Sequence, residues 1–566
     1  MENFRLYLAL GFTALCTYLA VLLGTHRSPA FLWLLVPGAG GGVLAYVEYL
    51  RLQRRKALTR LRAEWGVEKL KQKRDVQDAS ALFQVAPQPS TALDDRTWQD
   101  LTMDLIFAKI DRTLTWPGCQ RLYQLLRTPQ LGNLQELDTR RDMLSGFETD
   151  AAVREEVQLI LSGMDARIGA GLCTLLWDLP QVRPVHPPLL YQLMFGLAVL
   201  SPFLILLSPQ AALIPIFVFQ INMYLHFKVQ KQIRAYFEGV RSLRQLISAA
   251  RKLAKLEGAF LQEKLAEIRE ALVQVEGFTK LVRFVGVEAT DPLTNTILQY
   301  STIFFLREVR GFFKALRFIA AHQQALQSLF LAVGDLDALQ AAASYRASLD
   351  YYCEPEFTKK KQLHLEGAYH PLLLEPVPNS ITVQDQGILI TGSNMSGKST
   401  FLRTVGVNAL LAQTIATCPA RVYRGCPVQL KTSIGRADNV VEGKSYYLEE
   451  ALSVLRIIKA VNNDWVTLAI FDELYRGTNS EERIFAARQV LEYLVQRNVL
   501  VLAATHDLEL TELLQETYDS WHFSEKVGEL GLEFDYKLKK GPALTRNAIA
   551  LLRHLGYPQE ITDGKN

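Results

Sequence analysis

The chain has 566 residues, enough for several domains at roughly 100–200 residues each. Hydrophobic residues make up 49% of it, and the formal net charge of +4 is too small to indicate a nucleic-acid-binding protein by itself. The six cysteines are scattered without a C-x-x-C pair, which argues against a zinc ribbon or a dense disulfide framework. Reduced, buried thiols in a cytosolic body are expected instead.

The first predicted element is an apolar hairpin in residues 1–50. Apolar runs cover Leu6–Gly24 and Ala30–Val47, each close to the ~20 residues that span a bilayer. No convincing cleavage site follows the first run, so a transmembrane hairpin is favoured over a signal peptide. Gly38 and Gly42 have the G-x-x-x-G spacing of closely packed helices, although a small-residue kink explains them equally well.

Residues 51–97 are predicted to be a basic juxtamembrane segment followed by a linker. The stretch Arg51–Arg74 holds ten Lys or Arg against two Glu. Basic residues beside a membrane helix indicate the cytoplasmic side and can bind anionic lipid headgroups, and a DNA-binding stripe is the second interpretation. The sequence APQPSTALDD near the end of the segment is typical of a linker.

Two predicted helical regions flank a second apolar hairpin. Helical periodicity indicates the first part of a helical core in residues 98–185 and its second part in residues 229–355. Between them, residues 186–228 hold two apolar runs, the second of which is shorter and includes Gln220 and Asn222. They predict a second transmembrane hairpin, with a buried helical hairpin as the alternative.

The pattern changes in residues 356–566, where short apolar runs alternate with helical stretches. Runs such as GILIT, WVTLAIF and VLVLAAT are bounded by glycine or polar clusters, as buried strands are. Strands that alternate with helices predict a largely parallel sheet covered on both faces. We therefore expect an α/β nucleotide-binding domain attached to a mostly helical body.

A phosphate-binding loop follows the first of these strands. The sequence TGSNMSGKST fits G-x-x-x-x-G-K-[ST], in which glycines let backbone N–H groups point at phosphate oxygens at a helix N-terminus. Lys398 should reach the β- and γ-phosphates of ATP, and the Ser399 hydroxyl should bind Mg²⁺. The expected nucleotide-binding residues are Gly392, Ser393, Asn394, Met395, Ser396, Gly397, Lys398, Ser399 and Thr400.

The ends of two further strands are expected to complete the site. Asp472 ends the strand in WVTLAIFDE, where such sites place an acidic Mg²⁺ ligand, and Glu473 is placed to act as general base toward water. Without the loop, this pair would be interpreted as a strand-end cap. His506 follows the strand in VLVLAATHD and could sense the γ-phosphate, whereas a lone histidine is more often a cap. Ser445 opens an amphipathic helix and could also meet a phosphate, although its spacing does not indicate which one.

Four stretches, in this order, resemble the MutS family of mismatch-repair ATPases: TGSNMSGKST, IGRADNVVEGKS, FDELYRGTN and ATHDLEL. Asn394 and Met395 within the loop are typical of that family. The stretches EGAYHPLL, DLIFAKIDRTLTWPGCQRLYQLLRTPQ, LAVGDLDALQAAASY and GPALTRNAIALLRHLGYPQEI extend the likeness to residues 98–180 and 230–566.

The resemblance implies a fold class: an α/β P-loop ATPase domain of the ABC type that follows a mostly α-helical core and lever region. The N-terminal and internal transmembrane helical hairpins are additions to it. The family works as dimers with composite ATP sites, so Ser445 would reach the partner's γ-phosphate, and the end of residues 356–566 would form dimerisation helices. By the same likeness the catalytic residues are Lys398, Glu473 and His506, and the Mg²⁺ ligands are Ser399 and Asp472.

Several features depart from the family. Its mismatch-reading domain and connector domain have no counterpart in the sequence, and the second hairpin interrupts the helical body. Ser393 and Ser396 stand where the family more often has Pro and Gly. No aromatic residue that could stack on adenine is evident near Val377–Asn379.

The expected function is ATP binding and hydrolysis by a membrane-anchored, MutS-like homodimer that binds mismatched or branched DNA. ATP and Mg²⁺ are its expected cofactors, the lipid bilayer and DNA its expected partners, and no repair or recombination partner is indicated. The expected location is a bacterial inner membrane with the ATPase domain in the cytoplasm. An ATP-driven membrane scaffold without nucleic acid is the alternative. An ABC-type transporter is less favoured, because VVEGKSYYLEE lacks the Gly-Gly-Gln usual in transporter signatures.

Overall fold

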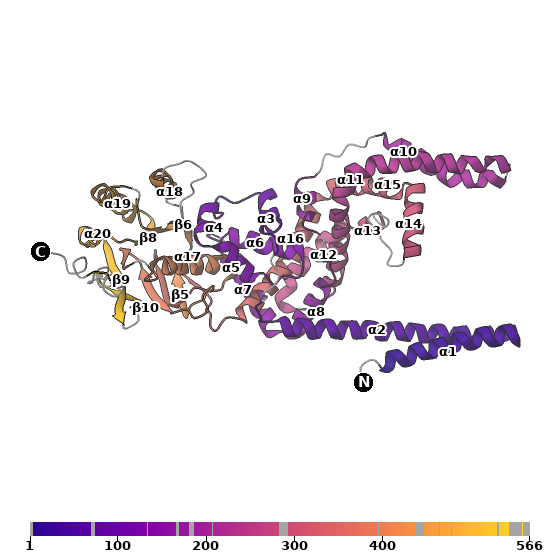
Figure 1. The fold of residues 1–566 in the computed structure, drawn as a ribbon, viewed down its shortest axis with the longest axis horizontal. Helices are drawn as coiled ribbons and strands as arrows, with labels where there is room; N and C mark the ends of the chain where they lie inside the picture. The colour runs from indigo at the N-terminus through magenta and orange to yellow at the C-terminus, as the bar shows by residue number, and fades with distance from the viewer. Residues whose placement is uncertain are drawn as a thin grey trace.

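The chain is elongated, with an α/β domain at one end, a helical body in the middle and two apolar hairpins that project from the other end (Figure 1). The computed structural model describes residues 4–68, 74–132, 134–165, 169–179, 186–206, 208–281, 292–393, 395–435, 446–462, 464–476, 478–528, 531–542 and 557–558. Four of its segments are long and apolar enough to cross a membrane: Arg5–Thr25, Pro29–Glu64, Leu189–Leu206 and Pro209–Lys231.

The first apolar hairpin consists of α1 (Phe4–His26), η1 (Pro29–Leu34) and the first half of α2 (Leu35–Glu64). Gly41 is the point of closest approach, because a Cβ atom there would lie 2.7 Å from the Thr13 hydroxyl of α1. A Cβ at Gly38 would also be crowded, at 3.2 Å from Cys16, whereas one at Gly42 would meet nothing nearer than 3.9 Å. Gly38 and Gly41 therefore form the contact, rather than the Gly38–Gly42 pair.

The helix α2 does not end where its apolar residues end. It continues into the basic segment as far as Glu64, and Arg62 forms an ion pair of 2.7 Å with Glu155 on α8 (Ala151–Leu161) of the helical body. The stretch that we expected to be a linker is packed as well, since Leu93 is buried and its backbone N–H donates to the Arg127 carbonyl over 2.8 Å. The first hairpin is thus joined to the body through a continuous helix.

The second apolar hairpin consists of α10 (Pro188–Leu200), η2 (Ser201–Leu206), η3 (Pro209–Ala212) and the first half of α11 (Leu213–Leu253). It projects in the same direction as the first, away from the α/β domain (Figure 1). The helix α11 has 41 residues and runs without interruption from the hairpin into the core of the body.

The body is built from short helices around one long buried helix, α16 (Gln323–Arg346), which packs against α6, α7 and α12. Its other helices are α3 (Val76–Val85), α4 (Asp95–Asp100), α5 (Met103–Ile110), α6 (Trp116–Arg127), α7 (Leu134–Thr149), α8 (Ala151–Leu161), α9 (Leu172–Trp177), η4 (Ala259–Leu261), α12 (Gln262–Gln274), α13 (Phe278–Leu281), α14 (Pro292–Phe304) and α15 (Arg307–Ala321).

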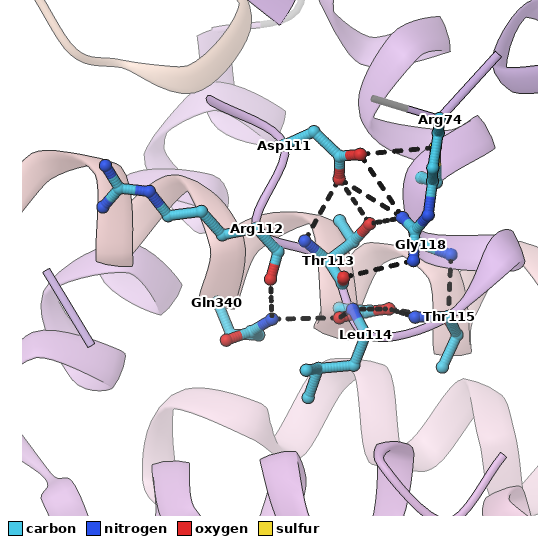
Figure 2. Close-up of polar contacts among 10 residues, drawn as sticks. Arg74, Asp111, Arg112, Thr113, Leu114, Thr115, Gly118 and Gln340 are labelled. Atoms are coloured by element: carbon cyan, nitrogen blue, oxygen red, sulfur yellow. Dashed lines mark hydrogen bonds and ion pairs between the residues drawn. The ribbon is translucent and has the colours of Figure 1, made fainter. Parts of the chain in front are cut away.

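The buried carboxylate of Asp337 ties α16 to the loop before α6, and Figure 2 labels its partners Leu114, Thr115 and Gln340. Asp337 accepts hydrogen bonds from the backbone N–H groups of Leu114 (2.9 Å) and Thr115 (2.8 Å) and from the Gln340 amide (2.9 Å). Burial raises the pKa of Asp337, and its hydrogen bonds oppose that rise. Gly118 is required at this point, because a Cβ there would lie 2.2 Å from the carboxylate.

The α/β domain contains a six-stranded sheet of order β10-β9-β4-β8-β7-β6, parallel except for β10. Its strands are β4 (Gly387–Thr391), β6 (Val428–Ile434), β7 (Val466–Asp472), β8 (Val499–Ala504), β9 (Tyr518–Gly528) and β10 (Gly531–Lys540). One face packs against α17 (Lys398–Ile415) and the helical body, and the other against α18 (Tyr446–Ala460) and α19 (Ser480–Val495). The predicted parallel sheet with both faces covered is confirmed.

Smaller elements complete the domain. A second sheet of order β1-β5-β2-β3 consists of β1 (Glu356–Phe357), β5 (Val422–Gly425), β2 (Leu363–Ala368) and β3 (Asn379–Val383), and α20 (Glu509–Leu513) follows β8. The sequence did not predict this sheet or the antiparallel β9–β10 pair.

The helical body docks directly on the α/β domain. Asp100 at the end of α4 accepts hydrogen bonds from the Thr432 hydroxyl (2.8 Å) and the Ile434 backbone N–H (3.0 Å), both on β6. Arg403 on α17 donates to the backbone carbonyl of the same aspartate over 2.8 Å. One residue of the body therefore contacts both the helix that follows the phosphate-binding loop and a strand of the main sheet.

Candidate nucleotide-hydrolysis site

The phosphate-binding loop leaves the centre of the sheet at the end of β4, whose five residues are all buried. Gly392 and Gly397 both have positive φ angles, of 146° and 104°, which favour glycine. Any Cβ at Gly392 would also lie 2.9 Å from the Phe523 carbonyl. The Ser396 hydroxyl donates to the Ser393 carbonyl over 2.8 Å, so the serine is accommodated inside the turn.

Lys398 begins α17, and its side chain folds back over the loop. Its ammonium donates to the Gly392 and Ser393 carbonyls, each over 2.8 Å, and lies 3.3 Å from Nε2 of His506. The cation is therefore held between the phosphate-binding loop and the end of β8, as a phosphate-binding lysine requires.

Asp472 is the last residue of β7 and is only 7% exposed. Its Oδ1 atom is buried and accepts no hydrogen bond from any described residue. A buried carboxylate oxygen is costly unless a donor or a cation meets it. This makes Asp472 a fitting ligand for Mg²⁺, together with Ser399 in the first turn of α17.

The remaining ligands of such a cation would have to come from phosphate and water. Among the described residues, no cluster of three or more His, Cys, Asp or Glu side chains could hold a metal by itself. Mg²⁺ is usually bound by one or two protein groups together with phosphate oxygens and water. The pair of Ser399 and Asp472 agrees with that mode.

Glu473 is held in an unusual backbone conformation directly after β7. Its φ angle is 58° and that of Tyr475 is 62°, and left-handed non-glycine residues of this kind are uncommon in proteins and often lie at functional sites. Its carboxylate lies 2.7 Å from Nε2 of His506 and forms a second ion pair with Arg476. Burial alone would raise the pKa of Glu473, but hydrogen bonds from His506 and Arg476 outweigh it and lower the pKa to about 2.

The turn that carries His506 is anchored by its neighbour. Asp507 accepts two hydrogen bonds from Arg483 on α19, of 2.8 and 2.6 Å, and its own N–H donates to the Thr505 hydroxyl over 3.0 Å. A bidentate arginine–carboxylate pair fixes geometry more firmly than a single contact. His506 is therefore presented toward Glu473 by contacts that do not involve the ring itself.

A cavity of 490 Å³ adjoins these residues, large enough for a small-molecule ligand. Its wall includes three side chains that the sequence did not indicate: Tyr536 on β10, His370 after β2, and Phe523 on β9. Burial, together with Arg403 and Lys109, lowers the pKa of His370 to about 4. The full lining is Ala368, His370, Leu373, Glu375, Val377, Asn379, Ser393, Met395, Gly397, Lys398, Ser399, Thr400, Phe401, Thr404, Glu473, Arg476, Phe523 and Tyr536.

An aromatic residue reaches the part of the cavity near Val377–Asn379 from a distant strand. The Asn379 amide donates to the Tyr536 carbonyl over 2.9 Å, and the Tyr536 ring stacks on Phe534 with centroids 5.8 Å apart. The antiparallel β9–β10 pair brings this ring to the cavity. The sequence could have indicated the ring only if residues 518–540 had been predicted to form this strand pair.

The structure brings several of the predicted site residues together, and others lie outside the residues that it describes. Lys398, His506 and Glu473 lie in one line of contacts, and Ser399 and Thr400 face the same cavity. Asn394 and Ser445 lie outside the described residues, as do the expected C-terminal dimerisation helices at residues 543–556 and 559–566.

Comparison with known proteins agrees with the site. Residues 388–565 match the family described as MutS domain V. The DNA mismatch repair protein MutS of Staphylococcus epidermidis is 32% identical over 269 residues, which cover 45% of this chain and 30% of that protein. The protein of the same name from Natronomonas pharaonis is 30% identical over 256 residues, covering 43% of this chain and 29% of that protein.

A longer match reaches into the helical body. The DNA mismatch repair protein MutS of Thermus aquaticus is 27% identical over 497 residues, which cover 81% of this chain and 59% of that protein. The chain thus spans less than two thirds of the length of each of these relatives. Residues 388–565 therefore form a MutS domain V, and the similarity to MutS proteins extends from it into the helical body.

Proposed function

We propose that this chain is a membrane-anchored ATPase that binds and hydrolyses ATP with Mg²⁺. The observation that carries the proposal is the line of contacts from Lys398 through His506 to Glu473, with steps of 3.3 and 2.7 Å. It joins a phosphate-binding cation to a carboxylate across the ends of three parallel strands. Such a line matches the needs of phosphoryl transfer, where positioning and charge stabilisation supply most of the catalysis.

Each side chain then has a separate task. Lys398 neutralises the β- and γ-phosphates, and Ser399 and Asp472 hold Mg²⁺, which offsets the charge of the phosphate oxygens. Glu473 accepts a proton from the attacking water, and His506 orients Glu473 and senses the γ-phosphate. Arg476 competes for the Glu473 carboxylate, so this ion pair has to loosen when water takes the position next to the base.

The proposal includes a dimer and DNA. Curated MutS relatives carry the name of DNA mismatch repair proteins, and the family match covers the domain in which Ser445 would meet the partner's γ-phosphate. Mismatched or branched DNA is the proposed ligand of the helical body. Hydrolysis would act on that body through Asp100, which binds both β6 and α17.

The proposal also includes a membrane. Two apolar hairpins with large exposed side chains, such as Trp33 at 77% and Leu206 at 84%, project from the same end of the body. Exposed apolar surfaces of this extent indicate a lipid or protein partner. The basic residues that follow the first hairpin favour the cytoplasmic side for the ATPase domain.

The test uses the full chain in lipid nanodiscs. ATP turnover is measured without DNA and with homoduplex, mismatched and branched DNA at low and high salt, and Lys398→Ala serves as the inactive reference. We expect turnover that is absent from the Lys398→Ala variant, and DNA binding that weakens steeply with salt. Absence of turnover would refute the ATPase. Turnover without binding to any DNA in low salt would refute the DNA ligand and favour an ATP-driven membrane scaffold.

A further inference from the structure

We propose that α14 is an interfacial membrane helix that lies along the bilayer surface and inserts one apolar stripe into the lipid. This rests on the proposed membrane anchoring and extends it to an element outside the four candidate spans. Residues 292–306 contain no Asp, Glu, Lys or Arg, although α14 belongs to the helical body by sequence position. A surface helix of a soluble body is normally charged on its outer face.

The outer face of α14 carries three large apolar side chains in one line. Leu293, Ile297 and Tyr300 are spaced at i, i+4 and i+7, which places them on one side of a helix. They are exposed by 70%, 62% and 59%. A helix that buries such a stripe at a lipid interface sinks its apolar face about 5–10 Å into the boundary of headgroups and acyl chains.

Packing places α14 at the level of the second apolar hairpin. Its rings Tyr300 and Phe304 contact Phe219 of α11, with centroids 6.3 and 6.1 Å apart. The Asn222 amide donates to the Phe304 carbonyl over 2.6 Å. Both α11 residues lie inside the candidate span Pro209–Lys231, so the end of α14 is attached to an apolar part of the hairpin.

Orientation agrees with this placement. In Figure 1, α14 stands at the end of the body from which both hairpins project, and it runs across their direction. If the hairpins enter the bilayer along its normal, a helix that crosses their direction lies in the plane of the membrane. Tyr300 then has the position that tyrosine favours, with its ring at the level of the headgroups.

The helix after α14 in the chain, α15, carries cationic side chains that would lie among the polar headgroups. Arg310 on α15 places its guanidinium 3.7 Å from the centroid of Phe195 on α10, and Arg307 lies 5.1 Å from the ring of Phe305. Arginines beside apolar rings at this level can keep their charge among lipid phosphates while their stems cover apolar surface. Lipid is therefore a better occupant of the stripe than a second protein surface.

The position of α14 beside the second hairpin limits how much of that hairpin lies beyond it. Beyond the contact at Phe195 and Asn222, the second hairpin extends by only about 20 Å at the usual helical rises. The hydrocarbon core is about 30 Å thick. If α14 lies at the bilayer surface, the part of the second hairpin beyond it is therefore shorter than the hydrocarbon core.

The experiment uses the full chain in nanodiscs, in a background without its native cysteines. Single cysteines replace Ile297 in the stripe, Gln299 on another face of α14, and Leu15 on α1, and each carries a polarity-sensitive fluorophore. Gln299 is exposed as well, and it points about 200° away from Ile297 around the helix. Each labelled protein must elute as a single peak before it is compared.

We expect the probe at Ile297→Cys to emit at shorter wavelength than the probe at Gln299→Cys and to lose emission when shallow quencher lipids are added. Quenching at Leu15→Cys with identical, unquenched spectra at 297 and 299 would overturn the role of α14 and leave the anchoring intact. A blue shift at 297 without quenching by lipid would overturn it too, because protein would then cover the stripe. Absence of quenching at all three positions would refute the anchoring and, with it, this inference.

Discussion

The two ends of the molecule place their apolar side chains in opposite ways. In the α/β domain, β4 and β8 bury every residue, and the polar groups Lys398, Glu473 and His506 collect where the strands end. In the hairpins, the apolar residues point outward instead. One end therefore builds its site by removing apolar surface from water, while the other leaves apolar surface exposed, which the proposed membrane would cover.

The helical body between these ends is held together by buried polar contacts as well as apolar ones. Asp337 fixes the loop before α6, and Asp100 fixes the body to the main sheet. Long helices such as α11 and α16 cross the body. The predictions below separate the ATPase end, the body and the hairpin end from one another.

The largest effect is expected at the base of the ATP site. Glu473→Gln should lower ATP turnover by roughly 10²–10⁴-fold, the usual contribution of a general base, because the amide cannot accept the proton. ATP binding, measured by equilibrium dialysis, should remain. The matched control is Glu481→Gln, the same change at an exposed position in the first turn of α19, which should leave turnover unchanged. Normal turnover by Glu473→Gln would contradict the assignment.

The next largest effect is expected in the body. Asp337→Ala should lower the free energy of unfolding by about 3–5 kcal/mol, because two backbone N–H groups and a hydroxyl are left buried without their acceptor. Urea unfolding of the detergent-solubilised protein measures it. Asp138→Ala, at a side chain that is 58% exposed, is the control and should have little effect. Equal destabilisation by both variants would show that the hydrogen bonds drawn in Figure 2 do not stabilise the body more than an exposed surface residue does.

A smaller effect is expected within the first hairpin. Gly41→Ala should destabilise it by about 1–3 kcal/mol through overpacking, because the new methyl group would meet the Thr13 hydroxyl at 2.7 Å. Gly40→Ala, where nothing lies within 4 Å, should stabilise α2 by up to about 1 kcal/mol through helix propensity. Thermal unfolding in detergent compares the two, and ATP turnover should change in neither. The reverse order of stabilities would show that α1 and α2 do not pack through Gly41.

The smallest effect is expected from Arg476→Ala and concerns pH. Hydrogen bonds from His506 and Arg476 hold the pKa of Glu473 at about 2, below its ordinary value of 4.5, so the carboxylate stays ionised throughout the neutral range. The stabilisation from these contacts is complete above pH 4.5 and is lost as the pH falls through the folded-state pKa.

Removing Arg476 should raise the pKa of Glu473 toward 4.5. The acidic limb of the turnover-versus-pH curve should therefore move to higher pH while the neutral rate stays close to normal. Arg488→Ala, on the solvent side of α19, is the control, because its ion pair with Glu492 lies outside the site. An acidic limb that shifts equally in both variants, or not at all, would show that Arg476 does not control the base.

The motifs of the ATP site were predictable because each one is contiguous in sequence. Gly392, Gly397 and Lys398 form one loop, and its positive φ angles follow from a turn that only glycine makes easily. Asp472 and Glu473 end one strand, and the alternation of apolar runs with helical stretches was enough to predict the parallel sheet. The apolar hairpins were equally visible, since length and composition define candidate spans.

Other features were not predictable, since they join residues far apart in the chain. The contact between Lys398 and His506 bridges 108 positions, and Tyr536 reaches the cavity only because β10 folds back on β9. The packed stretch around Leu93 resembles a linker by composition, and its burial depends on helices that follow it. Local composition carries no information on such partners.

By itself, the sequence determined the P-loop, the pair of carboxylates at the end of β7, the parallel sheet and the two apolar hairpins, because local backbone preference and hydrophobic periodicity specify them. Only the tertiary structure decided that His506 stands between Lys398 and Glu473, that Gly41 is the contact point of the first hairpin, and that α14 presents an uncharged stripe beside the second. Those features depend on which surfaces remain uncovered after distant segments have packed, and the free energy of that packing is shared across the whole chain.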